Sequence, residues 1–360
     1  MLLTVNSYCQ NYILYGDKTF GTAYYNDVKP AIMRVGNYLL IAGQTNANLG
    51  QDKTEPKCDS LNQFDGDIWI LKIDTAFNIL WNRSIGGERG ENCAHLLKNN
   101  SNGFFLSCES KSDSVCERTE HNRGASPQYD YWIFEGDSAG NRIRDKTFGG
   151  SLGDGSTQLI RLTSGNYIAC GGSNSPISGD KSVAPYNTSG DYWAVKFDST
   201  GTKIWDQIYG GTGYEYGDDA YDYLFNILAD DHDNFLLAGT ISGPASGNIS
   251  DTSRGDMDFW IIKIDSSGNK IWDKRYGGIG EERCNHIIHT ADNGYLVCGC
   301  TLSPQGLDVT DSPKGSGDCW VLKLDSLGNK QWDKRYGGIN GSSGGTWMEP
   351  APGGGYWISG

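Results

Sequence analysis

Two kinds of side chain in the sequence could bind a ligand: isolated tryptophans and clustered acids. Trp347 and Trp357 lie outside the register in which the other tryptophans recur, so we expect them to be available for contact with a ligand. Asp218, Asp219 and Asp222 lie in an acidic run, and carboxylates are ligands that Ca²⁺ prefers. The run lacks the Asp-x-Asp-x-Asp-Gly spacing of known calcium loops, so solvated turns are the preferred interpretation. Ca²⁺ is therefore the one cofactor that the sequence leaves as an alternative, and no other cofactor is expected.

The 10 cysteines include no Cys-x-x-Cys pair and no zinc-ligand spacing. Cys93 and Cys108 flank one expected hairpin turn, and Cys284 and Cys300 flank another. We therefore predict a cross-strand disulfide in one or both pairs, provided that the Cα atoms lie within about 7 Å. Disulfides of this kind favour an exported protein.

The five histidines are scattered, and no catalytic constellation can be assembled around them. His95 and His286 occupy the same position of a repeat, two residues after a cysteine, where a strand could bring them near a central channel. Two histidines from separate repeats do not make a metal site without further ligands. We expect neither a catalytic residue nor a bound metal from this pattern.

A repeat of 60–67 residues organises the chain. Residues 258–278, which contain Asp-x-Trp-x-x-Lys-x-Asp, Gly-Asn-Lys-x-Trp and Tyr-Gly-Gly, return almost unchanged as residues 318–338. The first tryptophan of each repeat stands at one register, which favours a core position. These tryptophans are Trp69, Trp132, Trp193, Trp260 and Trp320.

Each repeat predicts four short strands, which we term A to D, joined by hairpin turns such as Ala291–Gly294. Helix signals are almost absent, so the fold class is all-β, and four strands in about 60 residues are typical of a β-propeller blade. The Gly-Gly pair that ends strand D is expected to need positive φ. Small residues stand at one position of strand B and should be buried: Ala42, Ser107, Cys170, Ala238, Cys298 and Ser359.

The two ends of the chain bear on the number of blades. Six A–B pairs are followed by five C–D pairs, and residues 12–21 read as a lone strand D. We expect one propeller domain over residues 12–360, closed by that N-terminal outer strand, with six blades first and seven next. The missing strand C favours a fragment truncated at its C-terminus. Residues 1–11 read either as a signal-peptide remnant or as an ordinary disordered start.

Composition excludes several classes of protein. The 50 glycines among 360 residues show no period of three, so the chain is not collagen-like. The aromatic content of 12% argues against disorder, and no apolar run approaches the length of a membrane helix. The net charge of −14 makes nucleic acid and anionic membranes poor partners.

The repeated motifs resemble the SBBP-type β-propeller repeats of secreted bacterial proteins. Residues 46–55 and 175–182 resemble the variant found in Bacteroidetes surface proteins, which often end in a type IX secretion sorting domain. The resemblance spans residues 12–360 and implies export and recognition rather than one particular chemistry.

Long segments between strands B and C are expected to gather on one face of the domain, where binding usually resides. We predict a secreted or cell-surface protein that binds a protein or a glycan through this face and is not an enzyme. An extracellular polysaccharide hydrolase or lyase, and a structural spacer in a larger surface protein, are the alternatives. A carboxylate pair at hydrolase separation would favour the enzyme.

Overall fold

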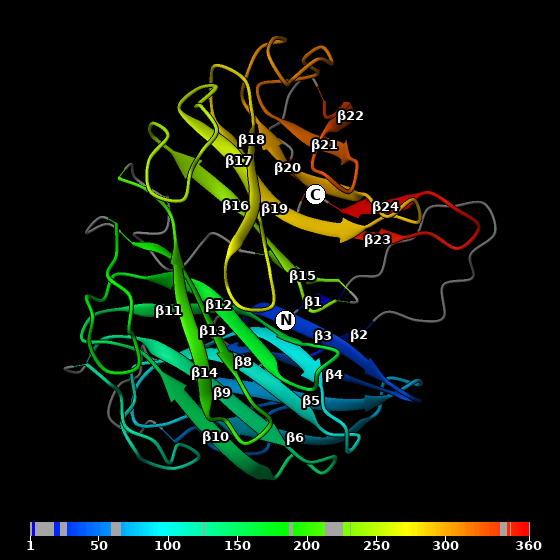
Figure 1. Cartoon of the computed structure of the whole chain (residues 1–360). Coiled ribbons are helices and arrows are strands. Elements are labelled where there is room, and N and C mark those ends of the chain that lie inside the picture. Colours follow the sequence, from blue (N-terminus) through cyan, green and yellow to red (C-terminus); the bar gives the residue numbers. More distant parts are fainter. Residues whose placement is uncertain are drawn as a thin grey trace. The chain divides into compact units, whose positions relative to one another are not determined.

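The computed structural model describes residues 2–3, 18–21, 27–58, 66–124, 127–186, 190–212, 226–230, 232–338, 344–345 and 347–359. Every regular element in these ranges is a β-strand, as the alternation of β-branched and aromatic residues predicts (Figure 1). A search of the same ranges for a helix long and apolar enough to cross a membrane finds none.

Five four-stranded sheets follow one another along the chain. Sheet 1 contains β3 (Asp27–Val35), β4 (Tyr38–Thr45), β5 (Asp67–Asp74) and β6 (Ile79–Ile85). Sheet 2 contains β7 (Glu91–Lys98), β8 (Phe104–Ser110), β9 (Asp130–Gly136) and β10 (Arg142–Phe148). Sheet 3 contains β11 (Asp154–Arg161), β12 (Tyr167–Ser173), β13 (Asp191–Phe197) and β14 (Lys203–Tyr209).

Sheet 4 contains β15 (Asn226–Ala229), β16 (Phe235–Ser242), β17 (Met257–Ile264) and β18 (Lys270–Tyr276). Sheet 5 contains β19 (Glu282–His289), β20 (Tyr295–Thr301), β21 (Asp318–Leu324) and β22 (Lys330–Tyr336). Two short pairs accompany them: β1 (Leu2–Leu3) with β2 (Lys18–Thr19), and β23 (Trp347–Pro350) with β24 (Tyr356–Ser359). In each four-stranded sheet the strands lie in chain order, which is the meander of a β-propeller blade.

The chain divides into two compact units. Unit 1 comprises residues 1–159 and 178–180, and unit 2 comprises residues 160–177 and 181–360, so strand β11 begins in one and ends in the other. Within unit 1, Leu40, Ala42 and Ile70 of sheet 1 share a core with Trp132 and Phe134 of sheet 2. Within unit 2, similar clusters join sheet 3 to sheet 4, sheet 4 to sheet 5, and sheet 5 to β23 and β24.

The repeating tryptophans are core residues, as predicted. The five side chains at the first register are all buried, and the indole Nε1 of Trp320 donates to Asp333 Oδ2 at 3.0 Å. The small strand-B residues from Ala42 to Cys298 are also buried, whereas Ser359 is exposed. Regular spacing therefore identified the side chains that fill the space between sheets.

The expectation that the Gly-Gly pairs need positive φ is wrong. Gly86, Gly149 and Gly277 are absent from the residues with positive φ. A Cβ atom at Gly277 would instead clash with the Asp258 carboxylate, and Gly86 and Gly149 meet equivalent carboxylates. Close approach to a buried acid, rather than backbone conformation, requires glycine at these positions.

The N-terminal strand-D prediction falls partly outside the described residues, because residues 12–17 are not among them. Of the remaining part, Lys18–Thr19 (β2) pairs with Leu2–Leu3 (β1), and the role of this segment as a strand D stays a prediction. Phe20 is buried against Ile41 and Trp69 of sheet 1, and the Gly21 N–H donates to Asp52 Oδ2 at 3.2 Å. Gly277 makes the same bond to Asp308 in unit 2, also at 3.2 Å.

The predicted Cys284–Cys300 disulfide is absent, because both residues are free thiols. Cys284 pairs with Gly299 across β19 and β20, whereas Cys300 pairs with Arg283. An offset of one residue places two side chains on opposite faces of a sheet, so the sulfur atoms cannot meet. The other predicted pair, Cys93 and Cys108, lies in direct register, but the Cys93 side chain is outside the described residues. That bond stays a prediction.

Candidate functional site

Each long segment between strands B and C is a candidate binding segment, and we number them as long loops 1 to 5. They span residues 46–66, 111–129, 174–190, 243–256 and 302–317. In a propeller such loops are the variable surface on a rigid scaffold, so their order and their exposed side chains decide what they can bind.

A repeated polar anchor fixes each long loop to its own sheet. In loop 5 the backbone N–H of Thr310 donates to Asp333 Oδ2 at 2.8 Å, and the Thr310 hydroxyl donates to the other carboxylate oxygen. Burial alone would raise the pKa of Asp333, but the hydrogen bonds from Lys330 and from these loop and indole donors lower it to about 2. The equivalent pairs are Thr54–Asn82, Thr119–Asp145, Ser182–Asp206 and Ser250–Asp273.

A second anchor holds each loop four residues after the first. The aspartate that begins strand C accepts a hydrogen bond from a loop backbone N–H four to nine residues earlier, as Asp318 does from Lys314 at 2.9 Å. The other four bonds are Cys58 to Asp67, Arg123 to Asp130, Tyr186 to Asp191 and Arg254 to Asp258, all at 3.0 Å or less. The two anchors therefore fix a short segment inside each loop to buried carboxylates or an amide of its own sheet.

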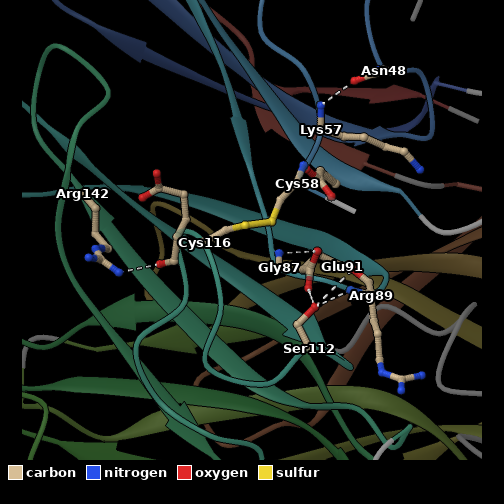
Figure 2. Close-up of a disulfide and its surroundings, with 11 residues drawn as sticks. Asn48, Lys57, Cys58, Gly87, Arg89, Glu91, Ser112, Cys116 and Arg142 are labelled. Atoms are coloured by element: carbon tan, nitrogen blue, oxygen red, sulfur yellow. Dashed lines mark hydrogen bonds between the residues drawn. A yellow bond between two sulfur atoms is a disulfide. The ribbon is translucent and has the colours of Figure 1, made fainter. Parts of the chain in front are cut away.

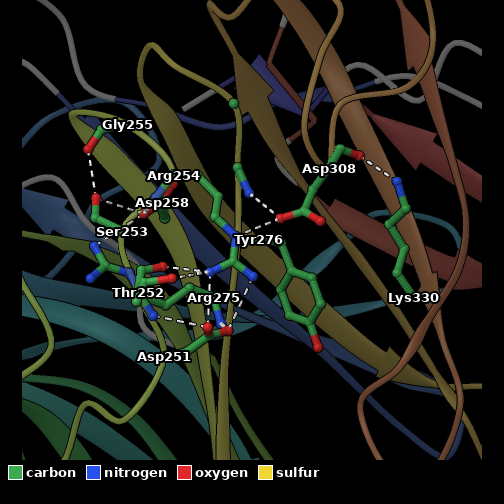
Figure 3. Close-up of polar contacts among 12 residues, drawn as sticks. Asp251, Thr252, Ser253, Arg254, Gly255, Asp258, Arg275, Tyr276, Asp308 and Lys330 are labelled. Atoms are coloured by element: carbon green, nitrogen blue, oxygen red, sulfur yellow. Dashed lines mark hydrogen bonds and ion pairs between the residues drawn. The ribbon is translucent and has the colours of Figure 1, made fainter.

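Arginine bridges one long loop to the next (Figure 3). Arg254 of loop 4 pairs with Asp251 of its own loop at 2.9 Å and with Asp308 of loop 5 at 3.1 Å. In unit 1, Arg123 of loop 2 makes the equivalent pairs with Glu120 at 2.9 Å and with Asp180 at 2.6 Å. Asp308 and Asp180 also bind the Gly-Gly turn of the preceding sheet, so each bridge joins two sheets.

A disulfide makes a further connection between loops (Figure 2). Cys58 of loop 1 is bonded to Cys116 of loop 2, with Cα atoms 6.4 Å apart and a sequence separation of 58. The sequence analysis did not find this pair, because neither cysteine lies in the strand repeat. A signal was nevertheless present, because each cysteine lies close to the anchoring threonine of its loop. Cys58 follows Thr54, and Cys116 precedes Thr119.

Buried carboxyl groups face each other where one sheet leads into the next. Glu91 accepts hydrogen bonds from Ser110 Oγ at 2.7 Å, from Gly87 N–H at 3.1 Å and from Ser112. Burial raises the pKa of Glu91 to about 8, and the nearby Asp67 carboxylate adds to the effect. These carboxyl groups have no exposed surface, so they position the turn rather than meet a substrate.

Sheets 2 and 4 show why the effect differs between repeats. Burial, with Asp154 nearby, raises the pKa of Asp130 to about 7. Asp258 stands at the same position in sheet 4 but pairs with the buried Arg275 at 3.0 Å. Burial still raises the pKa of Asp258, while Arg275 opposes the rise. In sheet 2 the residue equivalent to Arg275 is Thr147, and the buried Arg118 donates to its hydroxyl at 2.8 Å. The charges of Arg118 and Arg123 likewise oppose the rise in the pKa of Asp130.

The tips of three long loops present large aliphatic side chains to solvent. Leu49, Ile177 and Leu307 are 56%, 61% and 60% exposed. Leu307 lies in a tight turn closed by a bridge between Gly306 and Val309, and its φ is 52°. The equivalent positions of loops 3 and 4 hold Gly179 and Gly247, at φ 56° and 57°. A leucine in this left-handed conformation is unusual, because its Cβ is disfavoured there. The sequence analysis did not single out these three residues.

The two predicted ligand tryptophans lie together. Trp347 pairs with Ser359, and Glu349 pairs with Trp357, so all four side chains share one face of β23 and β24. The two indoles are 47% and 45% exposed, and Trp347 Nε1 donates to Glu349 Oε1 at 3.2 Å. One ring face of Trp347 stacks on His286, with centroids 4.0 Å apart.

The predicted acidic site, Asp218, Asp219 and Asp222, lies outside the described residues. In the second acidic run, Asp230 accepts hydrogen bonds from the turn residues His232 and Asn234, and Asp233 accepts them from Thr163 and Ser164. Those two aspartates are turn residues, as preferred. Among the described side chains, no group of three or more His, Cys, Asp and Glu forms a cluster suited to a metal ion.

The histidines at the shared repeat position bond one sheet to the next. His286 Nδ1 accepts a hydrogen bond from the Met348 N–H at 3.2 Å, and Asn226 Oδ1 accepts one from Ile287 N–H at 3.4 Å. Burial lowers the pKa of His286 to about 4, which keeps the ring neutral and able to accept. Burial likewise lowers the pKa of His95 to about 4. His95 differs from His286 in its bonding, because its buried Nδ1 has no hydrogen-bond partner among the described residues and the ring bonds the Leu159 backbone instead.

No protein-family model matches the chain, and no curated protein matches it either. Among solved structures, hydrazine synthase from Kuenenia stuttgartiensis is 11% identical, with a TM-score of 0.49 over 98% of this chain and 77% of that chain. A protein of unknown function from Bacteroides caccae is 11% identical, with a TM-score of 0.43 over 87% and 83%.

A GH43_1 enzyme from Xanthomonas citri is 9% identical, with a TM-score of 0.42 over 85% of this chain and 90% of that chain. All three TM-scores lie below 0.5, so neither fold nor chemistry is carried over from these proteins. The architecture rests on the sheets of this chain.

Proposed function

We propose that this protein is an exported β-propeller that binds a protein partner through its five long loops and catalyses no reaction. Six blades are the expected number, with strands of both chain ends sharing one blade. The Cys58–Cys116 disulfide supports export, because such bonds persist in oxidising compartments. The resemblance to secreted SBBP-type repeats also supports export. Secretion by the type IX system is the more specific form of this proposal.

Leu307 is the single observation that carries the choice of a binding function. A turn position that holds Gly179 and Gly247 in loops 3 and 4, and Gln51 and Cys116 in loops 1 and 2, holds a mostly exposed leucine in loop 5. Its positive φ is one that leucine disfavours. Nothing in the packing of the loop rewards this side chain. Residues kept in disfavoured backbone conformations concentrate at functional sites, so contact with a partner is a reason for its presence.

The chemistry of the tips favours a protein over a sugar. Leu49, Ile177 and Leu307 offer apolar area without an aromatic ring or a converging set of polar groups. Exposed apolar side chains with polar surroundings are typical of protein interfaces. The double anchors and the loop-to-loop arginines hold these tips in place beforehand, which lowers the entropic cost of binding.

Glycan binding at β23 and β24 is the second candidate. Its support is the exposed pair Trp347 and Trp357 beside Glu349, a combination suited to stacking and hydrogen bonding with a sugar ring. The same strand position in sheets 4 and 5 holds Leu236 and Leu296, which are buried in the cores with the strands that follow. That face therefore serves packing elsewhere in the chain, which favours the loops.

Two binding screens separate these candidates. The purified chain is screened against a phage-displayed library of constrained peptides and against a glycan array. We expect peptides that lose binding to a Leu49→Ser, Ile177→Ser, Leu307→Ser variant and keep binding to the matched strand variant Ile204→Ser, Ile271→Ser. Glycans whose binding is lost on Trp357→Ala, with no loop-dependent peptide, would replace the first candidate by the second. Turnover of a polysaccharide would contradict both.

A further inference from the structure

Three thiols gather on one face of sheet 5. Cys300 of β20 pairs directly with Cys319 of β21, and Cys298 stands two residues before Cys300, so the three side chains point to the same side. The segment Gly344–Gly345 packs over them, since Cys298 Sγ contacts the Gly345 carbonyl at 3.6 Å. A Cβ at Gly345 would lie only 2.6 Å from Cys319 Sγ.

The fourth cysteine of this sheet belongs to the other face. Cys284 is buried with Val297, Trp320 and Leu322, in the core between sheets 4 and 5. Cys298 and Cys319 are buried with Met348, in the core that faces β23. The two cores lie on opposite sides of the sheet, which removes Cys284 from any pairing with the other three.

Distance selects one pair among the three thiols. Residues directly opposite in an antiparallel sheet have Cα atoms about 4.5–5.5 Å apart, within the range of about 4.4–6.8 Å that a disulfide spans. Cys300 and Cys319 meet this condition. Cys298 is diagonal to Cys319, and diagonal neighbours lie about 7–8 Å apart, beyond that range.

We propose that Cys300 and Cys319 are an oxidisable pair that closes a second, cross-strand disulfide when the protein meets a disulfide oxidant such as glutathione disulfide. The Cys300 thiolate, on the more exposed residue of the pair, attacks one sulfur of the oxidant and releases a first glutathione thiolate. The Cys319 thiolate then attacks Cys300 Sγ and releases the second. Two protein thiols are oxidised, one glutathione disulfide is reduced, and both protons pass to the released glutathione.

The bond would act on long loop 5. Cys300 lies two residues before the first residue of that loop and Cys319 two residues after its last, so the disulfide would tie its two ends. The Cys58–Cys116 bond already connects loops 1 and 2. The inference does not depend on the proposed binding function, because it concerns only the state of the two sulfur atoms.

Peptide mapping of the full chain tests the proposal. The folded protein is equilibrated in glutathione buffers from reducing to oxidising, quenched with acid and N-ethylmaleimide, and digested with trypsin. Cleavage after Lys314 separates the two cysteines, so the bond joins the peptide of residues 284–314 to that of residues 315–323. We expect this linked pair in oxidising buffer and its loss in reducing buffer.

Variants assign the sulfur atoms, because Cys284, Cys298 and Cys300 share one tryptic peptide. The linked pair should persist in Cys284→Ala and in Cys298→Ala, and should vanish in Cys300→Thr, the residue found at the equivalent Thr240. Formation of Cys58–Cys116 in each sample reports that the chain has folded. A linked pair that survives Cys300→Thr would overturn the assignment, as would wild-type protein that forms Cys58–Cys116 while residues 300 and 319 remain fully alkylated.

Discussion

At the residue scale, buried titratable groups hold the junctions between successive sheets. Glu91 and Asp130 are buried acids whose pKa values are raised, while His95 and His286 are buried bases whose pKa values are lowered, in each case chiefly by burial. The two kinds of group make opposite demands on pH. Between about pH 4.5 and 6.5 the two effects on stability oppose each other, so the net loss from these groups should appear above about pH 6.5.

We expect Glu91, in unit 1, to cause part of the loss of stability as the pH rises. Because its folded pKa of about 8 exceeds the unfolded value, the native state holds an extra proton, and the free energy of unfolding falls as pH rises. At about 1.4 kcal/mol per pH unit, the loss from this residue between pH 6 and 8 is about 2 kcal/mol. Denaturation of Glu91→Gln across this range should show a smaller loss. The exposed Glu349→Gln serves as control, and equal slopes for wild type and Glu91→Gln would refute the assignment.

We expect His286 to have the opposite effect, a loss of stability as the pH falls. As pH falls from about 6.5 to 4, the unfolded chain takes up a proton that folded His286 does not, so stability falls. His286→Asn should keep the acceptor, as Asn226 does in sheet 4, and remove this loss. His286→Leu leaves the Met348 N–H unsatisfied and should cost about 1–3 kcal/mol at neutral pH. Thermal unfolding at pH 4.5 and 7 measures both, and an Asn variant as acid-labile as wild type would count against this role.

Leu307 provides a prediction in which a substitution does no harm to the fold. Glycine accepts the left-handed turn, so Leu307→Gly should leave the free energy of unfolding unchanged or raise it by up to about 1 kcal/mol. Leu327 is equally exposed but is not among the residues with positive φ, so Leu327→Gly should lose stability. Urea denaturation compares the two. A marked loss in Leu307→Gly would mean that the side chain supports the loop itself.

At the element scale, the long loops are fixed to their sheets and to one another. Carboxylates or an amide of strands C and D hold a short segment inside each loop. A disulfide joins loop 1 to loop 2, and arginines join loop 2 to loop 3 and loop 4 to loop 5. Order of this kind suits a surface that presents a few side chains to a partner.

Removal of the Cys58–Cys116 bond measures one of these connections. A bond that closes a segment of 58 residues is expected to contribute about 4 kcal/mol through the entropy of the unfolded chain. The double variant Cys58→Ser, Cys116→Ser should lose a sizeable part of this on chemical denaturation. Cys170→Ala, at a position where other sheets hold Ala42 and Ala238, should lose much less. Similar losses in the two variants would argue that the bond does not stabilise the fold.

The sequence predicts the regular parts of this fold and few of the irregular ones. The strands, their order, the buried tryptophans and the small strand-B residues follow from a repeat whose spacing reflects packing. The sequence analysis attributes the need for glycine in the Gly-Gly pairs to a positive φ. It misses the close approach of the Asp258 carboxylate to Gly277, because the two residues lie 19 positions apart in the chain. The Cys284–Cys300 pair was predicted from turn symmetry, which ignores the bulge that shifts the register between Cys284 and His286.

At the whole-molecule scale, the proposed function is that of an exported protein that binds a protein partner through its long loops. The acidic charge of −14 suits an extracellular protein and disfavours nucleic acid as a partner. Leu49, Ile177 and Leu307 could not be chosen from sequence, because exposure and backbone conformation, rather than residue type, distinguish them from core leucines and isoleucines.

The affinity of a selected peptide for the loop variants tests the central proposal most directly. Titration calorimetry compares wild type, the Leu49→Ser, Ile177→Ser, Leu307→Ser variant, and the strand variant Ile204→Ser, Ile271→Ser. The account predicts that the loop variant binds at least about tenfold more weakly, a loss of about 1.4 kcal/mol, while the strand variant binds as wild type does. Equal affinity of the loop variant and wild type, with both folded, would contradict it.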